Sequence, residues 1–163
     1  MRYPIAVFAV IAVLAALGLC AQVPDPLNGT WKLNVAKSKV SAAELAQKSA
    51  TTRFEVTQDT IKMVNDAVDV QGRVMHAEYT AKFDGKDYPW KGTIDGKPNP
   101  DQDAVAVQRV DSHTYLVTNK LKGQTLTIQR TVVADDGKSR TNTVIGKTVQ
   151  GQPVNVTMVY EKQ

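Results

Sequence analysis

Cysteine and histidine are scarce in this chain, and their scarcity excludes several kinds of site. Of 163 residues, one is a cysteine, Cys20, and two are histidines, His76 and His113. Disulfide frameworks, cysteine-rich zinc sites and Cys–His nucleophilic catalysis are therefore excluded, and one chain cannot supply a metal site of three histidines. Because Cys20 lies within the first 22 residues, the remainder of the chain carries no thiol that an oxidising compartment would attack.

Clustered charge and catalytic motifs are missing as well. The chain has 20 Lys and Arg residues against 16 Asp and Glu, a net charge of +4, but the basic residues are scattered and no aromatic platform interleaves them. We therefore expect no nucleic-acid partner. The sequence has no glycine-rich phosphate loop, no H-E-x-x-H motif and no Ser-His-Asp order, and acidic pairs such as Asp135-Asp136 are typical of turns. These absences favour a protein that is not an enzyme and that holds neither a metal nor a cofactor.

The one long hydrophobic run lies near the N-terminus. Arg2 is followed by an uncharged apolar segment that ends at Leu19, which is typical of a signal peptide and short for a membrane span. The small residue Ala21 offers a cleavage site. We therefore predict a signal peptide over residues 1–21 and a single domain over residues 22–163, with no membrane span after the signal is removed.

Export would place the mature chain in the periplasm of a bacterium or outside the cell. Two alternatives remain open, a retained N-terminal anchor and lipidation at Cys20. The segment Leu17-Gly18-Leu19-Cys20 resembles a bacterial lipobox, although a small residue is preferred where Leu19 stands. We expect the mature protein to be a monomer.

Beyond this segment, apolar and polar residues alternate with a period of two. Val154, Val156, Met158 and Tyr160, for example, share one face of their segment. This pattern is typical of half-buried strands, and pairs such as Asp-Gly and Lys-Gly punctuate it as turns. We predict nine or ten strands, near residues 29–34, 51–58, 61–67, 73–83, 87–93, 103–110, 114–121, 124–134, 139–148 and 153–161.

A single segment has a helical pattern. Ser41-Ala42-Ala43-Glu44 is a capping box, and it predicts a short helix over residues 41–48, between the first two strands. Because helices do not alternate with strands elsewhere, a parallel sheet is not expected. We predict an all-β, antiparallel up-and-down barrel of about eight to ten strands, since closure of the sheet removes its exposed edges.

The two ends of the predicted barrel carry a resemblance. Gly29-Thr30-Trp31 is a G-x-W signature, and segment 156–162 resembles the closing strand of fatty-acid-binding proteins. Together they resemble the calycin superfamily of lipocalins and fatty-acid-binding proteins, in an exported, lipocalin-like form. The resemblance implies an interior ligand, with Tyr160 matching the tyrosine of an R-x-Y pair that projects into the cavity. Met158 stands where that pair has its arginine, and segment 35–50 is short for a helical lid, so head-group selection should differ.

Two arginines are candidates for the interior. Arg130 shares a face with Leu126 and Ile128, and Arg109 shares a face with Val107. If that face of Arg130 lines the barrel, the site requires water, a counter-ion or an anionic ligand, because an unpaired charge in a dry core costs several kcal/mol. The alternative is that Arg130 lies at a strand end with its charge in solvent.

These observations define a predicted ligand site. Arg130 and Tyr160 would hold a polar or anionic head group, and apolar side chains would surround the tail. Trp31 is expected to plug one end of the barrel, because a large aromatic ring fills a barrel floor well. The predicted ligand-binding residues are Arg130, Tyr160, Arg109, Met158, Tyr79, Phe83, Phe54 and Met63.

Three functions remain open at this point. The first is a binding protein for a fatty acid or another small hydrophobic or anionic amphiphilic molecule. The second is a packed structural or protein-interaction barrel of the cell envelope that has no ligand. The third is an enzyme, for which the sequence offers no catalytic constellation.

Overall fold

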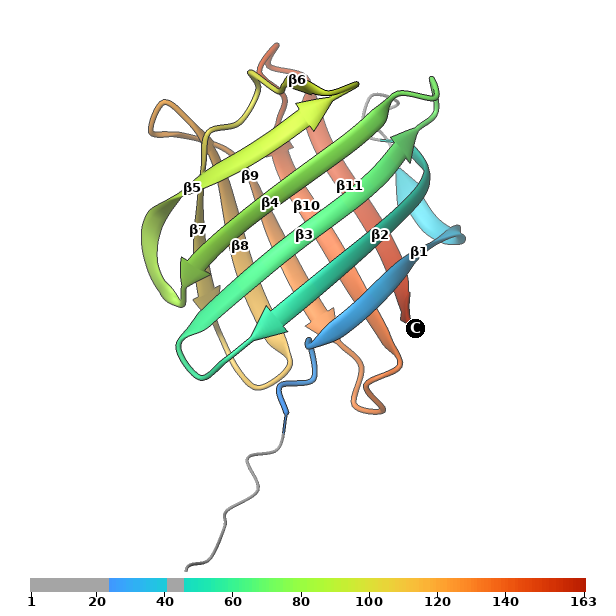
Figure 1. Ribbon diagram of the computed structural model, residues 1–163, viewed down its shortest axis with the longest axis vertical. Coiled ribbons are helices and arrows are strands. Elements are labelled where there is room, and N and C mark those ends of the chain that lie inside the picture. The colour runs from blue at the N-terminus through green and yellow to red at the C-terminus, as the bar shows by residue number, and fades with distance from the viewer. Residues whose placement is uncertain (1–23, 41–45) are drawn as a thin grey trace, which may run out of the picture.

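A computed structural model describes residues 24–40 and 46–163, most of which form one antiparallel β-sheet (Figure 1). The eleven strands are β1 (Gly29–Val40), β2 (Gln47–Val56), β3 (Thr60–Asp69), β4 (Val74–Lys82), β5 (Asp84–Ile94), β6 (Lys97–Pro98), β7 (Ala104–Arg109), β8 (Thr114–Leu121), β9 (Gln124–Val133), β10 (Ser139–Lys147) and β11 (Pro153–Lys162). Each of the ten strands predicted from the sequence overlaps one of these, and the two-residue strand β6 was not predicted.

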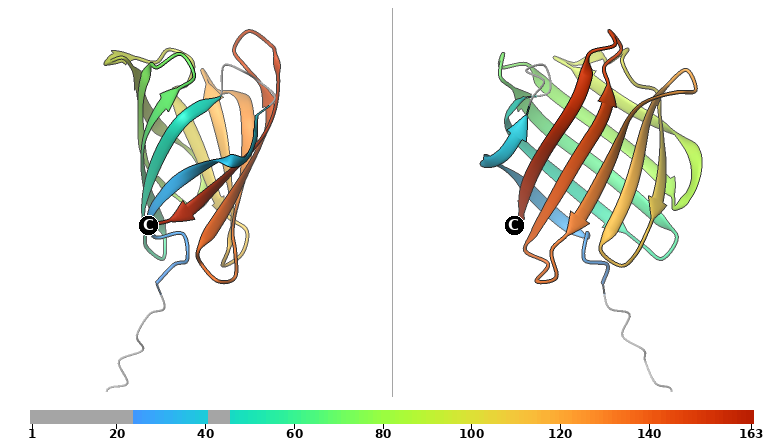
Figure 2. Two further views of the ribbon diagram at one scale, coloured as in Figure 1. Left: turned by 90° about the vertical axis from the view of Figure 1, so that its right-hand side faces the viewer. Right: turned by 180° about the vertical axis from the view of Figure 1, so that it is seen from behind.

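The sheet closes into a barrel of ten strands. Its order is β4-β3-β2-β1-β11-β10-β9-β8-β7-β5, and β5 returns to pair with β4, while β6 attaches to the end of β5. Strands β1 to β5 form one wall and β7 to β11 the other, as the view from behind in Figure 2 shows. The predicted all-β antiparallel barrel is therefore confirmed.

Strand β5 pairs with a different strand along each of its halves. Its first half pairs with β7, from Asp84↔Gln108 to Pro89↔Ala104, whereas its second half pairs with β4, from Tyr79↔Trp90 to Met75↔Ile94. The change of partner joins the two walls on one side of the barrel, and the pairing of β1 with β11 joins them on the other.

Two hairpins have the turn geometry that their sequences predicted. Asp95-Gly96 joins β5 to β6 with φ of 50° and 76°, and Lys122-Gly123 joins β8 to β9 with φ of 50° and 78°. Two consecutive positive φ values match the right-handed twist of the flanking strands, and glycine adopts them without steric cost. These turns set the register of strands on both walls.

The predicted helix and signal peptide fall largely outside the described residues. Residues 1–23, which include Cys20 and the predicted cleavage site, and residues 41–45 lie outside them. The rest of the predicted helix is not helical, because Gln47 and Lys48 belong to β2. Within residues 24–40 and 46–163, no helix is long and apolar enough to cross a membrane.

The N-terminal segment 24–28 seals one end of the barrel, which we call the sealed end. Trp31 is fully buried there, as predicted, and its indole nitrogen donates to the carbonyl oxygen of Leu27 over 2.8 Å. Asn28 holds the segment against β2 through its side-chain amide. The amide nitrogen donates to the carbonyl oxygen of Val56, and the amide oxygen accepts from the backbone N–H of Val56. The opposite end, which carries the turn at residues 70–73, we call the far end.

Candidate functional site

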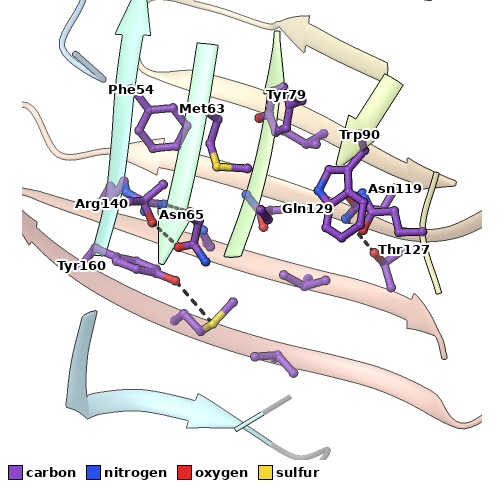
Figure 3. A pocket seen from close by; sticks show the side chains of 18 of the residues that line it. Phe54, Met63, Asn65, Tyr79, Trp90, Asn119, Thr127, Gln129, Arg140 and Tyr160 are labelled. Carbon is purple, nitrogen blue, oxygen red and sulfur yellow. Dashed lines mark hydrogen bonds between the residues drawn. The ribbon is translucent and has the colours of Figure 1, made fainter. Parts of the chain in front are cut away.

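A cavity of about 280 Å³ lies inside the barrel (Figure 3). One part of its lining is apolar or aromatic and comes mainly from β2 to β5 and β11, and the other is rich in amides and hydroxyls from β8, β9 and β10. The residues that line it are Gln47, Thr52, Phe54, Met63, Asn65, Ala77, Tyr79, Trp90, Gln102, Val117, Asn119, Thr127, Gln129, Arg140, Asn142, Val144, Val156, Met158 and Tyr160.

Arg140 is the one charged side chain among these lining residues of the described chain. It is 2% exposed and lies on β10 beside its cross-strand partner Tyr160, with its guanidinium carbon 3.7 Å from the centre of the Tyr160 ring. The same group lies 5.1 Å from the ring centre of Phe54 and 5.7 Å from that of Trp31. Aromatic faces attract a cation, so these three rings hold the guanidinium in place.

The guanidinium of Arg140 has no counter-ion in the described part of the chain. Its Nη1 donates to Oδ1 of Asn142 over 2.8 Å, but its Nε is buried and has no hydrogen-bond partner there. None of the ion pairs of the described residues involves it. Burial lowers the pKa of Arg140 to about 10, so the side chain carries a positive charge at neutral pH.

Polar side chains continue from Arg140 along the cavity wall. Oδ1 of Asn142 also accepts a bond of 3.0 Å from Thr131, which in turn accepts one of 3.1 Å from Gln129. All these partners are neutral, so they orient the guanidinium without cancelling its charge. Hydrogen bonds to neutral groups stabilise a buried charge less than an ion does.

The cavity reaches from Arg140 toward the far end of the barrel. Figure 3 shows Arg140, Phe54 and Tyr160 at one end of the cavity, and Trp90, Asn119 and Thr127 at the other. Asn119 donates to Thr127 over 2.9 Å. The ring of Trp90 packs over Gly92, where a Cβ atom would overlap it.

Arg130, the first candidate from the sequence, is not in the cavity. It is exposed on the outer face of β9 together with Ile128, which is 40% exposed. Leu126 also does not line the cavity, and the inward positions of this strand belong to Thr127 and Gln129 instead. The prediction that Arg130 faces inward is therefore wrong, because the more apolar face of β9 points outward.

Arg109 lies at the sealed end and not in the cavity. Its guanidinium pairs with Asp25 over 2.7 Å, donates to the carbonyl oxygens of Thr57 and Gln58, and stacks 4.1 Å from the ring centre of Phe83. Asp25 also accepts a bond of 2.6 Å from the hydroxyl of Tyr115. Arg109 and Phe83, both predicted to bind ligand, therefore hold the N-terminal segment against the barrel.

The other five predicted ligand-binding residues do line the cavity. They are Tyr160, Met158, Tyr79, Phe54 and Met63. The hydroxyl of Tyr160 lies 3.8 Å from the sulfur of Met158. Burial raises the pKa of both Tyr79 and Tyr160, so both phenols keep their protons at neutral pH.

Arg140 is the residue that the sequence reasoning missed. Its segment reads Arg140-Thr141-Asn142-Thr143, which has no apolar face to mark the interior. The signal that locates it is the register of the β10–β11 hairpin, where Arg140 pairs directly with Tyr160. Residues directly opposite in an antiparallel pair project to the same side, so an inward Tyr160 implies an inward Arg140.

Groups outside the cavity offer little chemistry. His76 bonds Asp66 over 2.7 Å on the outer surface, and His113 bonds Ser112 at a turn. Residues 24–40 and 46–163 contain no cluster of three or more His, Cys, Asp or Glu side chains arranged to hold a metal ion. The sequence matches no protein-family model and no curated protein.

Proposed function

We propose that the chain is an exported binding protein that holds a small anionic amphiphile inside its barrel, against Arg140. The single observation that carries the proposal is a fully buried guanidinium that faces a cavity and has no acidic partner among the described residues. A carboxylate or a similar anion would supply the missing counter-ion and would accept a bond from the free Nε.

The energetics favour an occupant over an empty, dry cavity. A buried, uncompensated charge costs several kcal/mol, whereas a charge-assisted hydrogen bond in such a place contributes about 1.5–3 kcal/mol. The rings of Phe54, Tyr160 and Trp31 fix the guanidinium. Little side-chain entropy is therefore lost when a ligand binds to it.

The size of the cavity favours a small ligand. Its volume of about 280 Å³ lies just below the range of roughly 300–1,000 Å³ that is usual for ligand pockets. A short or medium-chain acid fits this space better than a long-chain fatty acid.

The lining favours binding over catalysis. Among the lining residues of the described chain, none is a His, Cys, Lys, Asp or Glu, so no general base or reactive nucleophile faces the ligand. Calycin ancestry and export to the periplasm or the medium are part of the proposal and rest on the G-x-W signature and the N-terminal hydrophobic run. N-terminal sequencing of the exported protein should find Gln22 as the first residue.

Calorimetric titration with medium-chain acids tests the binding site. We expect Arg140→Met to weaken binding by about ten-fold or more, which corresponds to the loss of a charge-assisted hydrogen bond. Arg130→Met is the matched control, because it removes the same charge from the outer surface. It should leave the affinity unchanged.

Two results would overturn the proposal. One is that the wild-type protein binds no acid of any length. The other is that Arg140→Met and Arg130→Met bind equally well. Either result favours the second function, a packed structural or protein-interaction barrel in which Arg140 and its three aromatic neighbours form part of the core.

A further inference from the structure

A second unpaired polar atom lies in the cavity wall. Oε1 of Gln47 is buried and has no hydrogen-bond partner in the described part of the chain. Such atoms are rare, because a buried acceptor without a partner costs about 1–3 kcal/mol. Apart from Nε of Arg140, it is the one such atom on a described residue that lines this cavity.

The two unpaired atoms belong to opposite ends of the barrel. Gln47 begins β2 beside Asp69, next to the turn of the far end. Arg140 lies on β10 beside Tyr160 and stacks near Trp31 at the sealed end. One molecule that fills the cavity along its length would therefore meet a free donor at one end and a free acceptor at the other.

The lining between these two groups is suited to a hydrocarbon chain. Met63, Val144 and Met158 line the same cavity and present no strong hydrogen-bonding group. Amides of the opposite wall, such as those of Asn142 and Gln129, have partners within the protein. The buried side-chain atoms of this described lining that have no partner are thus those at its two ends.

Resting on the proposed function, we infer that the ligand is bifunctional, with an anionic group for Arg140 at one end and a hydroxyl group for Gln47 at the other. A hydroxyl donates to Oε1 of the amide as the structure has it, and it would accept from the amide nitrogen if the amide turned over. The chemical class is an ω-hydroxy carboxylic acid or an acid with a hydroxyl near its far end.

Titration with matched pairs of acids tests this inference. Octanoic acid and 8-hydroxyoctanoic acid, with the corresponding pairs of six, ten and twelve carbons, are titrated calorimetrically into the protein. We expect the hydroxy acid of the best-fitting length to bind about three- to ten-fold more tightly than its plain partner, which corresponds to one net hydrogen bond.

Substitution of Gln47 should reverse this preference. In Gln47→Met the hydroxyl would be buried without a partner, so we expect the plain acid to bind more tightly than the hydroxy acid. Gln71→Met is the matched control, because Gln71 is exposed on the turn of the same end of the barrel and does not line the cavity. It should keep the preference for the hydroxy acid.

The outcomes separate this inference from the function on which it rests. If plain and hydroxy acids bind equally well and Gln47→Met changes neither, the bifunctional ligand is wrong and the anion site stands. If neither kind of acid binds, both proposals fail. If Gln47→Met and Gln71→Met lose the preference alike, Gln47 has no specific role and the inference is overturned.

Discussion

Arg109 and Arg140 both lie against aromatic rings, but only the charge of Arg109 has an acidic partner among the described residues. Arg109, at the sealed end, has Asp25 at 2.7 Å and two backbone carbonyls as partners. Arg140, in the cavity, donates to the neutral amide of Asn142 and has no acidic partner in the described part of the chain. Nε is buried without a hydrogen-bond partner among the described residues in both arginines, so the difference lies in the charge. The charge of Arg109 is neutralised by Asp25, as a structural contact requires, whereas that of Arg140 is not, which is why we assign the binding site to Arg140.

Removal of the Arg109 side chain should have the largest effect on stability. We expect Arg109→Met to lower the free energy of unfolding by about 3 kcal/mol, because it leaves Asp25 largely buried without its cation and removes the contact with Phe83. Urea denaturation measures the change. Lys37→Met is the control, since its ion pair with Glu161 is exposed and should contribute less than about 1 kcal/mol. Equal losses in the two variants would contradict the assignment.

Alkaline pH should destabilise both regions. Burial raises the pKa of Tyr79 and Tyr160 near Arg140 and that of Tyr115 near Asp25 above the usual 10.0. Above pH 10 the unfolded chain releases these protons and the folded chain keeps them, so stability falls by up to about 1.4 kcal/mol per tyrosine and pH unit. The lowered pKa of Arg140 acts in the opposite sense from about pH 10 upward, but it is one group against three.

Tyrosine absorbance at 295 nm, followed together with circular dichroism, measures this effect. The buried tyrosines should ionise only as the protein unfolds. Ionisation of all tyrosines near pH 10 in a folded barrel would contradict the burial of these phenols.

Removal of the Arg140 side chain should have a small effect on stability. We expect Arg140→Met to leave the free energy of unfolding unchanged or to raise it by up to about 2 kcal/mol, because a buried charge without a counter-ion is replaced by an apolar chain of similar length. Thr131 still donates to Asn142 after the change. A loss of more than about 2 kcal/mol in thermal or urea unfolding would show that Arg140 is a structural residue like Arg109.

The fluorescence of the two tryptophans can distinguish the cavity from the sealed end, and this is the smallest of the expected effects. Trp90 lines the cavity and is half-buried, whereas Trp31 is sealed beneath the N-terminal segment. We expect ligand binding to change the fluorescence of Trp90. Trp90→Phe should abolish this change while calorimetry finds the affinity altered by less than about three-fold. A fluorescence change that persists in Trp90→Phe would mean that the ligand acts on Trp31.

The strands were predictable from sequence because alternation and turn residues are local signals. Gly96 and Gly123 mark hairpins whose geometry depends on a few neighbouring residues. Burial of Trp31 was also predictable, since a large aromatic ring at the start of the first strand of a barrel fills one end of its interior. The conformation of residues 46–48 was not, because a capping box is a weak signal and Gln47 pairs with Asp69 in the sheet.

The interior face was harder to predict than the strands themselves. In β9 the apolar residues Leu126 and Ile128 face outward and the polar residues Thr127 and Gln129 face the cavity. The usual rule assumes an apolar core, and it fails for a strand such as β9 that faces the polar part of a cavity. The choice between Arg130 and Arg140 therefore depended on cross-strand register, which is a property of pairs of strands and not of one segment.

The pairing of the first strand with the last has a consequence for how the protein is made. Trp31 on β1 is the direct neighbour of Lys162 on β11, so the ring cannot close until the ribosome has released both strands and everything between them. Contacts this distant in sequence form slowly, because a long loop must be ordered before they exist. A nascent chain whose barrel stays open until β11 has been made is also one that can pass unfolded through a membrane channel, as the export we propose requires.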